Sequence, residues 1–149
     1  MGLSFPSGPA LELLALKNTL PLIEIPFSIK LSKNGIIHDY GLEISLSGPE
    51  TFLQRRLQTA MCSKEQMAAS IFHFAGKLLA TLMKKAWEVE PLETVLTVGG
   101  VASNNLVRQT MASYLKETPI KVHHTHREFC SDNAVGIAVL ATAAFISKS

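Results

Sequence analysis

The chain has 149 residues, 47% of them hydrophobic and 17% charged, and its 14 basic and 12 acidic residues leave a formal net charge of +2. This size and composition indicate a single compact domain over residues 1–149 and exclude a chain that is disordered throughout. Basic and acidic residues are interspersed, which excludes a dedicated basic arm for nucleic acid. The longest apolar run, Ala134 to Ile146, is shorter than the roughly 20 residues of a membrane-spanning helix, so we predict no membrane contact.

The first third of the chain predicts a short helix followed by a β-hairpin. Pro9 suits the first position of a helix over PALELLALK, because its missing N–H would have no partner there. Asn34 and Gly35 accept the positive φ values of a tight turn between strands. From the alternation of β-branched and polar residues we expect strands near 28–32, 35–38 and 43–47.

The middle of the chain predicts one long helix, from about 64 to 88. Ser63 and Gln66 have the form of a capping box, and apolar residues follow at helical spacing from Met67 to Leu82. The apolar stripe is broad, so we expect this helix to be central, packed on a sheet or shared between two layers.

The second half alternates strands and helices. We predict a buried strand over TVLTVGG, a helix over SNNLVRQTMASYLKE, a strand over IKVHHT and a last helix over SDNAVGIAVLATAAFISK. Strand, helix, strand and helix in this order favour parallel strands joined by right-handed crossovers, and therefore an α/β fold.

The cysteines and histidines predict no structural metal site. Cys62 and Cys130 are far apart and outside any C-x-x-C spacing, and the first residues lack a secretory signal, so we expect a reduced protein in the cytoplasm. His123, His124 and His126 match no common zinc pattern. On a strand, His124 and His126 would share one face with His123 on the other, and we interpret all three as solvent or cleft-edge residues.

The turn after the TVLTVGG strand is the first candidate binding site. Gly99 and Gly100 separate a strand from a helix start, where unpaired backbone N–H groups hold phosphates and other anions. Asn104 would there hydrogen-bond a ribose or a carbonyl. A plain turn is the alternative, because the motif is neither G-x-G-x-x-G nor a Walker sequence.

Two other turns are also open to two interpretations. In FCSDNA, Asp132 stands at the predicted start of the last helix, where it either caps the helix or ligates a metal. In SLSGPET, Ser47 and Gly48 precede Pro49 at another predicted helix start. They make either a plain helix start or a second contact for an anion or nucleoside.

Four blocks together resemble the C-terminal half of the TsaD-type tRNA threonylcarbamoyladenosine transferases, formerly called O-sialoglycoprotein endopeptidases: GLSFPSGPALELLA, LEISLSGPET, VLTVGGVASNNLVR and EFCSDNAVGIA. The resemblance covers essentially the whole chain. It implies an actin-like ATPase fold of the ASKHA, ribonuclease H-like kind, with a mixed sheet flanked by helices. The chain would be the second lobe, without the N-terminal lobe.

The resemblance also implies a reaction. The family passes threonylcarbamoyl from threonylcarbamoyl-adenylate to N6 of the adenosine next to the anticodon, in tRNAs that read codons starting with A. By resemblance Gly8 in PSGP and Asn104 bind the nucleotide, ATP or the adenylate, and Gly99 and Gly100 make room for it. Asp132 matches a ligand of a divalent metal, iron or zinc. The implied partners are tRNA and TsaB-like and TsaE-like proteins.

Two hypotheses about activity remain open. The chain is either the nucleotide-binding lobe of a working transferase or a diverged, non-catalytic assembly or regulatory module. Glu50, where the family usually has lysine, and the lack of the family's H-x-x-x-H metal pair favour the second. We expect the chain alone to be inactive and to self-associate through the face that the missing lobe would cover. No protease motif is present, so we predict no proteolytic activity.

Overall fold

The computed structural model describes residues 2–3, 7–32, 41–91, 93–126 and 130. The predicted turn at Asn34 and Gly35, the strand over 35–38 and the last helix lie outside these residues. The α/β class is confirmed, and each of the other predicted elements has a counterpart within a few residues of its expected bounds. The elements are α1 (Ser7–Ala15), β1 (Ile29–Ser32), β2 (Gly41–Ile44), α2 (Ser47–Gln58), α3 (Lys64–Val89), β3 (Thr94–Thr97), α4 (Asn105–Leu115) and β4 (Lys121–His124).

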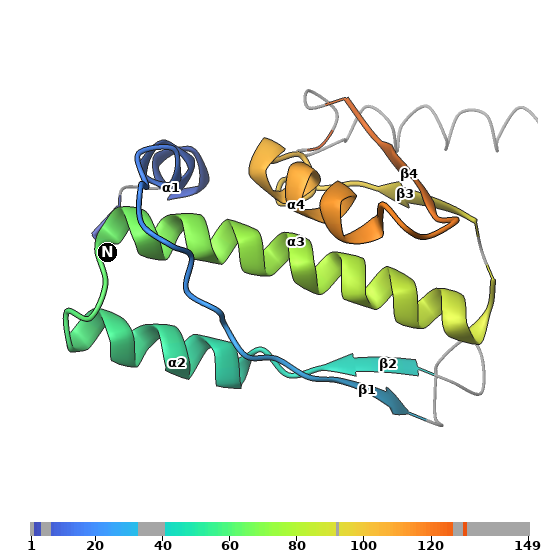
Figure 1. The fold of residues 1–149 in the computed structure, drawn as a ribbon, viewed down its shortest axis with the longest axis horizontal. Helices are drawn as coiled ribbons and strands as arrows, with labels where there is room; N and C mark the ends of the chain where they lie inside the picture. The colour runs from blue at the N-terminus through green and yellow to red at the C-terminus, as the bar shows by residue number, and fades with distance from the viewer. Residues whose placement is uncertain (1, 4–6, 33–40, 92, 127–129, 131–149) are drawn as a thin grey trace, which may run out of the picture.

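Helix α3 runs across the middle of the described part of the molecule. In Figure 1, α1, α4, β3 and β4 lie on one side of α3, and α2, β1 and β2 lie on the other. The prediction of a central helix shared between two layers is therefore confirmed. No helix among the described residues is both long and apolar enough to cross a membrane.

Ser63 caps α3, but only half of the predicted capping box forms. The Ser63 hydroxyl accepts a hydrogen bond from the backbone N–H of Gln66 at 3.0 Å, as expected of an N-cap residue. The Gln66 side chain donates instead to the carbonyl of Pro21 at 2.8 Å. The prediction of a reciprocal bond was wrong because Gln66 binds a distant segment rather than its own cap.

The extended segment 16–28 crosses α3 and is held there by polar bonds as well as apolar contacts. Ile23 and Ile25 are buried, and the N–H of Ile23 donates to the hydroxyl of Ser70 at 2.9 Å. Ser70 is fully buried and donates in turn to the Gln66 carbonyl of its own helix. Glu24 pairs with Lys77 at the surface. The segment is therefore attached to α3 through its residues from Pro21 to Ile25.

The apolar core lies between α3 and α4, with α1 against one end. Val107, Met111 and Leu115 recur every four residues on α4 and are 0%, 1% and 5% exposed. Side chains of this kind each stabilise the fold by about 1.5–3 kcal/mol relative to exposure. One buried cluster combines Ala15, Ala68, Phe72 and Val107, and a second combines Ala80, Met111, Leu115 and Ile120.

The described strands form two separate two-stranded sheets rather than one mixed sheet. Strands β1 and β2 are antiparallel, and β3 and β4 are parallel. The two pairs lie on opposite sides of α3 (Figure 1), so α3 keeps them apart. The expected mixed sheet is thus not found in the part of the chain that the structure describes.

The prediction that TVLTVGG forms a buried strand was wrong. Thr97 is buried, but Leu96 and Val98 are 65% and 63% exposed. In the register Leu96 lies opposite His123, while Val95 and Thr97 lie opposite Val122 and His124. Val95 and Val122 pack with the second core cluster, so only that face of the pair is covered by α4. The prediction failed because an apolar run does not show which of its faces finds a partner.

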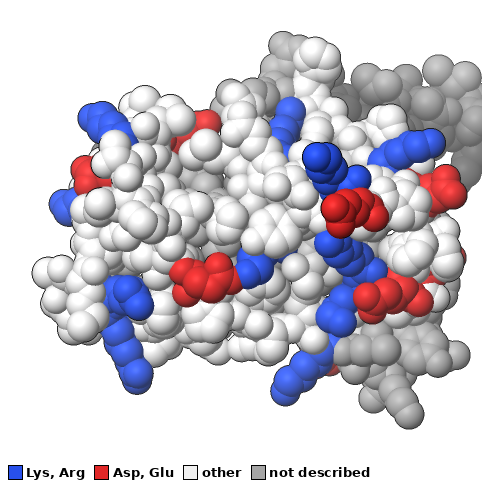
Figure 2. All heavy atoms as spheres, viewed as in Figure 1, with Lys and Arg blue, Asp and Glu red and all other residues white. Residues whose placement is uncertain are grey.

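On the face shown in Figure 2, the charged side chains of the described residues do not gather into a patch of one sign. Figure 2 shows lysine and arginine interspersed with acidic residues over this face of the molecule. This agrees with the near balance of charges in the sequence.

Helices α3 and α4 approach each other closely at Gly76, which gives a stability prediction. A Cβ atom at Gly76 would lie 2.6 Å from Cβ of Thr110 and 2.8 Å from the backbone oxygen of Val107. Gly76→Ala should therefore lower the free energy of unfolding by about 1–3 kcal/mol, because the backbone of α4 must move. Urea denaturation measures this change.

Gly48→Ala is the matched control, since a Cβ at Gly48 would meet nothing within 4 Å. Alanine should there leave stability unchanged or raise it by up to about 1 kcal/mol. An equal loss in both variants would mean that the close approach of α3 and α4 does not limit stability.

Candidate functional site

Residues 98–104, here called the glycine loop, connect β3 to α4. Gly99 has φ +96°, a conformation that side chains disfavour. The loop closes on itself, because the N–H of Ser103 donates to the Gly99 carbonyl at 3.1 Å and that of Asn104 donates to the Val101 carbonyl at 3.2 Å. The Ser103 hydroxyl donates to the Gly100 carbonyl at 2.7 Å. The loop thus has a defined shape of its own.

The two glycines differ in what they provide. Gly99 provides the backbone conformation, while a Cβ atom at Gly100 would meet nothing within 4 Å, so the space beside Gly100 is open. Within the described part of the chain, the N–H groups of Gly100, Val101 and Ala102 have no backbone acceptor. Successive unpaired N–H groups beside open space can hold an anion. This arrangement is compatible with the predicted ligand site, which stays a prediction.

Asn104 is the N-cap residue of α4. Its Oδ1 accepts hydrogen bonds from the N–H groups of Leu106 and Val107, at 2.9 Å and 3.2 Å, and the residue is only 7% exposed. The capping oxygen is therefore not available to a ligand. Any contact with a nucleotide would have to use the amide Nδ2, which can only donate.

Arg108 is a residue of this region that the sequence did not reveal. Its Nε donates to the carbonyl of Ala102 at 2.8 Å, and its Nη2 donates to the carbonyl of Thr125 at 2.9 Å. The guanidinium thus links the glycine loop to the end of β4. The signal that could have found it is its position on the first turn of the predicted helix, beside the loop, but neither acceptor is adjacent in the sequence.

The end of β4 holds a small polar cluster. Oγ1 of Thr97 lies 2.7 Å from Nδ1 of His124, and Oγ1 of Thr125 lies 2.8 Å from Sγ of Cys130. Cys130 is buried. The register places His124 opposite Thr97 and His123 opposite Leu96, so the two histidines lie on different faces as predicted.

Gly8 lies on the same side of α3 as the glycine loop. It is exposed in the first turn of α1, and a Cβ atom there would meet nothing within 4 Å. Helix α1 and the first turn of α4 contribute to one apolar cluster on α3, in which Ala15 and Val107 are buried and Leu11, Leu14 and Leu106 pack against the cluster. The structure therefore brings the helix that carries Gly8 next to the helix that Asn104 caps.

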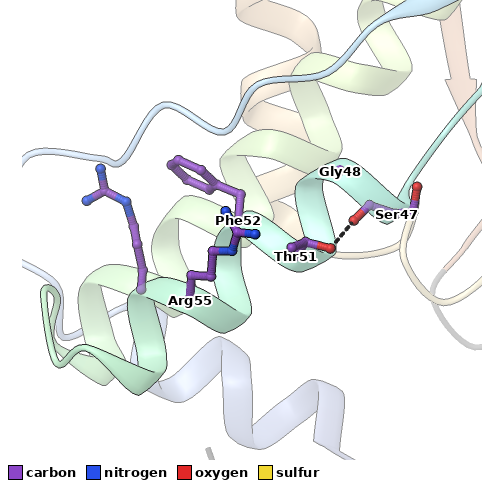
Figure 3. Close-up of a pocket in the computed structure, with 6 residues that line it drawn as sticks. Ser47, Gly48, Thr51, Phe52 and Arg55 are labelled. Atoms are coloured by element: carbon purple, nitrogen blue, oxygen red, sulfur yellow. Dashed lines mark hydrogen bonds between the residues drawn. The ribbon is translucent and has the colours of Figure 1, made fainter.

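Ser47 and Gly48 lie apart from the glycine loop, at the start of α2 on the opposite side of α3 (Figure 1). They border an open cavity of about 500 Å³, shown in Figure 3, which is also lined by Thr51, Phe52, Arg55 and Arg56. The guanidinium of Arg56 stacks 4.9 Å from the centre of the Phe52 ring. The two guanidinium groups, in the last turn of α2, favour an anion in this cavity, and the sequence did not point to either arginine.

The predicted metal ligand, Asp132, lies outside the described residues. Among the residues that are described, no three His, Cys, Asp or Glu side chains are arranged to hold a metal ion. The described residues alone thus do not form a metal centre.

The environment of His124 gives a prediction about pH. Partial removal of the ring from water is the main cause that lowers the pKa of His124, and the charges of Arg108 and His123 lower this pKa further. The neutral ring is therefore favoured in the folded state. The stability that the neutral His124 ring contributes is fully present above the pKa of the unfolded state, about 6.5. This stability is lost as the pH falls through the lower pKa of the folded state.

His124→Gln should therefore reduce the loss of stability between neutral and mildly acidic pH, as measured by urea denaturation. His123→Gln, on the opposite face of β4, should reduce this loss less, because the His123 charge is the smallest of the three causes that lower the pKa of His124. An NMR titration that gave His124 an ordinary or raised pKa would contradict the prediction.

Comparison with known proteins identifies the family. The family model described as TsaD, tRNA N6-adenosine threonylcarbamoyltransferase, matches residues 1–139. A probable bifunctional tRNA threonylcarbamoyladenosine biosynthesis protein of Thermoplasma acidophilum is 32% identical over 140 residues, 94% of this chain and 24% of that protein.

Two relatives named tRNA N6-adenosine threonylcarbamoyltransferase are similar to the same extent. The protein of Prochlorococcus marinus is 33% identical over 95% of this chain and 40% of its own length. That of Thermococcus kodakarensis is 32% identical over 93% of this chain and 39% of its own length. The chain thus spans about a quarter to two fifths of these relatives. Because the family model matches nearly the whole chain, the chain belongs to the TsaD family of tRNA N6-adenosine threonylcarbamoyltransferases.

Proposed function

We propose that the chain is the nucleotide-binding lobe of a tRNA threonylcarbamoyltransferase with an actin-like fold. The observation that carries the proposal is the glycine loop. Among the described residues, the N–H groups of Gly100, Val101 and Ala102 have no backbone acceptor, the space beside Gly100 is open, and a helix starts directly after the loop. Such N–H groups suit the phosphate of an adenylate. Membership of the TsaD family supports this choice of ligand.

In this proposal the described residues position the ligand. The loop N–H groups donate to the phosphate of ATP or threonylcarbamoyl-adenylate, and Nδ2 of Asn104 donates to the ribose or to a carbonyl. Gly8 borders the same nucleotide from α1, which packs beside the start of α4. Ser47 and Gly48, with Arg55 and Arg56 nearby, form a second anion contact on the other side of α3.

The acceptor of the whole protein would be N6 of the adenosine next to the anticodon in tRNAs that read codons starting with A. Asp132 would supply one ligand of a divalent metal, iron or zinc, whose other ligands come from outside this chain. TsaB-like and TsaE-like proteins would be the partners, and the cytoplasm the site of action. With one metal ligand, the chain alone would not catalyse transfer.

The second candidate is a non-catalytic assembly or regulatory module. Glu50 favours it, because it places a negative charge in the first turn of α2, beside the residues that line the cavity. Repulsion between this carboxylate and an anionic ligand would weaken binding there. The module would keep the fold and bind a protein partner without nucleotide affinity.

Calorimetric titration with ATP, and with a stable analogue of threonylcarbamoyl-adenylate, distinguishes the two candidates. We expect binding by the chain, and a loss of about tenfold or more in Asn104→Asp, which keeps a capping oxygen but replaces the donor Nδ2 with a charged acceptor. Asn105→Asp adds the same charge at the next, exposed position and should weaken binding less. A folded chain that binds neither ligand would support the non-catalytic module.

Self-association of the chain is a separate expectation. Leu96, Val98 and Val101 are each more than 60% exposed, on β3 and the glycine loop. Exposed apolar groups of this kind commonly mark an interface. Light scattering should show a dimer or larger species that Leu96→Lys shifts toward the monomer. A monomer at high concentration would contradict this expectation.

A further inference from the structure

We propose that Arg108 is a positioning residue that holds the glycine loop in its ligand-binding shape before a ligand arrives. The inference rests on the proposed nucleotide site and adds to it a residue that contacts the loop rather than the ligand. Arg108 lies on the first turn of α4, and its two bonds go to backbone carbonyls of two different segments. Its contribution would therefore not depend on the side chains at Ala102 and Thr125.

The glycine loop has little apolar packing to keep its shape. Val98 and Val101 are 63% and 62% exposed, and a Cβ atom at Gly99 or Gly100 would meet nothing within 4 Å. Ala102 is buried, and its carbonyl is the one that Arg108 binds. The loop depends on its internal hydrogen bonds, on the Asn104 cap at its end and on this guanidinium, since Ala102 is its only buried apolar residue.

Thr125, the second residue whose carbonyl Arg108 binds, is itself held in place by hydrogen bonds. The N–H of Thr125 donates to the Thr97 carbonyl at 3.3 Å, which continues the pairing of β3 and β4. Its hydroxyl lies 2.8 Å from Sγ of the buried Cys130. Thr125 is thus attached both to the neighbouring strand and to Cys130. Through Arg108, the glycine loop is linked to Thr125.

The geometry requires an arginine rather than any cation. The guanidinium is a planar fork whose Nε and Nη2 reach Ala102 and Thr125 together, at 2.8 Å and 2.9 Å. A lysine ammonium is a single point donor on a flexible stem, so it would not hold both carbonyls in the same arrangement. Arg108→Lys therefore separates the effect of positive charge from the effect of the fork.

The test compares Arg108→Met, Arg108→Lys and the neighbouring control Gln109→Met, which alters an exposed residue of the same helix. Hydrogen exchange of the Ser103 and Asn104 amides reports the loop, because both are bonded within it. We expect both Arg108 variants to exchange these amides about tenfold faster or more, with α3 unchanged, since bonds to charged groups are strong. ATP affinity should fall by a similar factor, and Gln109→Met should match the unaltered chain.

Several results would overturn the proposal. Unchanged exchange at Ser103 and Asn104 would show that Arg108 does not hold the loop. If the Arg108→Lys variant exchanged these amides as slowly as the unaltered chain, a positive charge at position 108 would be enough to hold the loop. Equally faster exchange throughout α3 and α4 would indicate a general structural role.

The exchange measurement also separates this proposal from the proposed function. If the unaltered chain fails to bind ATP, the nucleotide site fails, and exchange alone still decides whether Arg108 holds the loop. If ATP binds equally well to Arg108→Met, the positioning role is wrong while the nucleotide site stands.

Discussion

The close approach of α3 and α4 at Gly76 is the constraint on which the described structure depends. Gly76 permits contact between the backbones of the two helices, and the contact allows Val107, Met111 and Leu115 to bury fully against α3. Interiors are packed so densely that one added methyl group must displace its neighbours. The direction of α4 determines where its first turn points, and that turn carries both Asn104 and Arg108. A packing contact thus positions the candidate ligand loop.

Outside this apolar core, hydrogen bonds and an ion pair hold the chain in place. The extended segment 16–28 is attached to α3 through Ser70, Gln66 and the pair of Glu24 with Lys77. The glycine loop is attached through Arg108 and through its own backbone bonds. Directional bonds of this kind specify a geometry without covering the surface, and the space beside Gly100 stays open. Functional groups are commonly found on loops that a rigid scaffold holds in this way.

The predictions from sequence succeeded where the governing contacts are local. The long helix, the Ser63 cap, the parallel order of the later strands and the opposite faces of His123 and His124 all follow from periodicity and neighbouring residues. They failed for Gln66, whose partner Pro21 is 45 positions away, and for the exposed face of β3. Arg108 was missed because its acceptors are backbone carbonyls, which carry no residue signature.

At the candidate site, too, some features could be predicted from the sequence and others could not. The sequence by itself determined the family and the class of fold, because motifs and their spacing can be recognised along the chain. It also predicted Gly8, Gly99, Gly100 and Asn104 as ligand-site residues, and this stays a prediction. Only the tertiary structure decided that Asn104 uses its oxygen as a cap, that Ser47 and Gly48 lie across α3 from the glycine loop, and that Arg108 joins that loop to Thr125. These three features depend on the angle at which the helices cross and on which distant carbonyl groups come within hydrogen-bond distance. Neither can be predicted from the residues that are neighbours in the sequence.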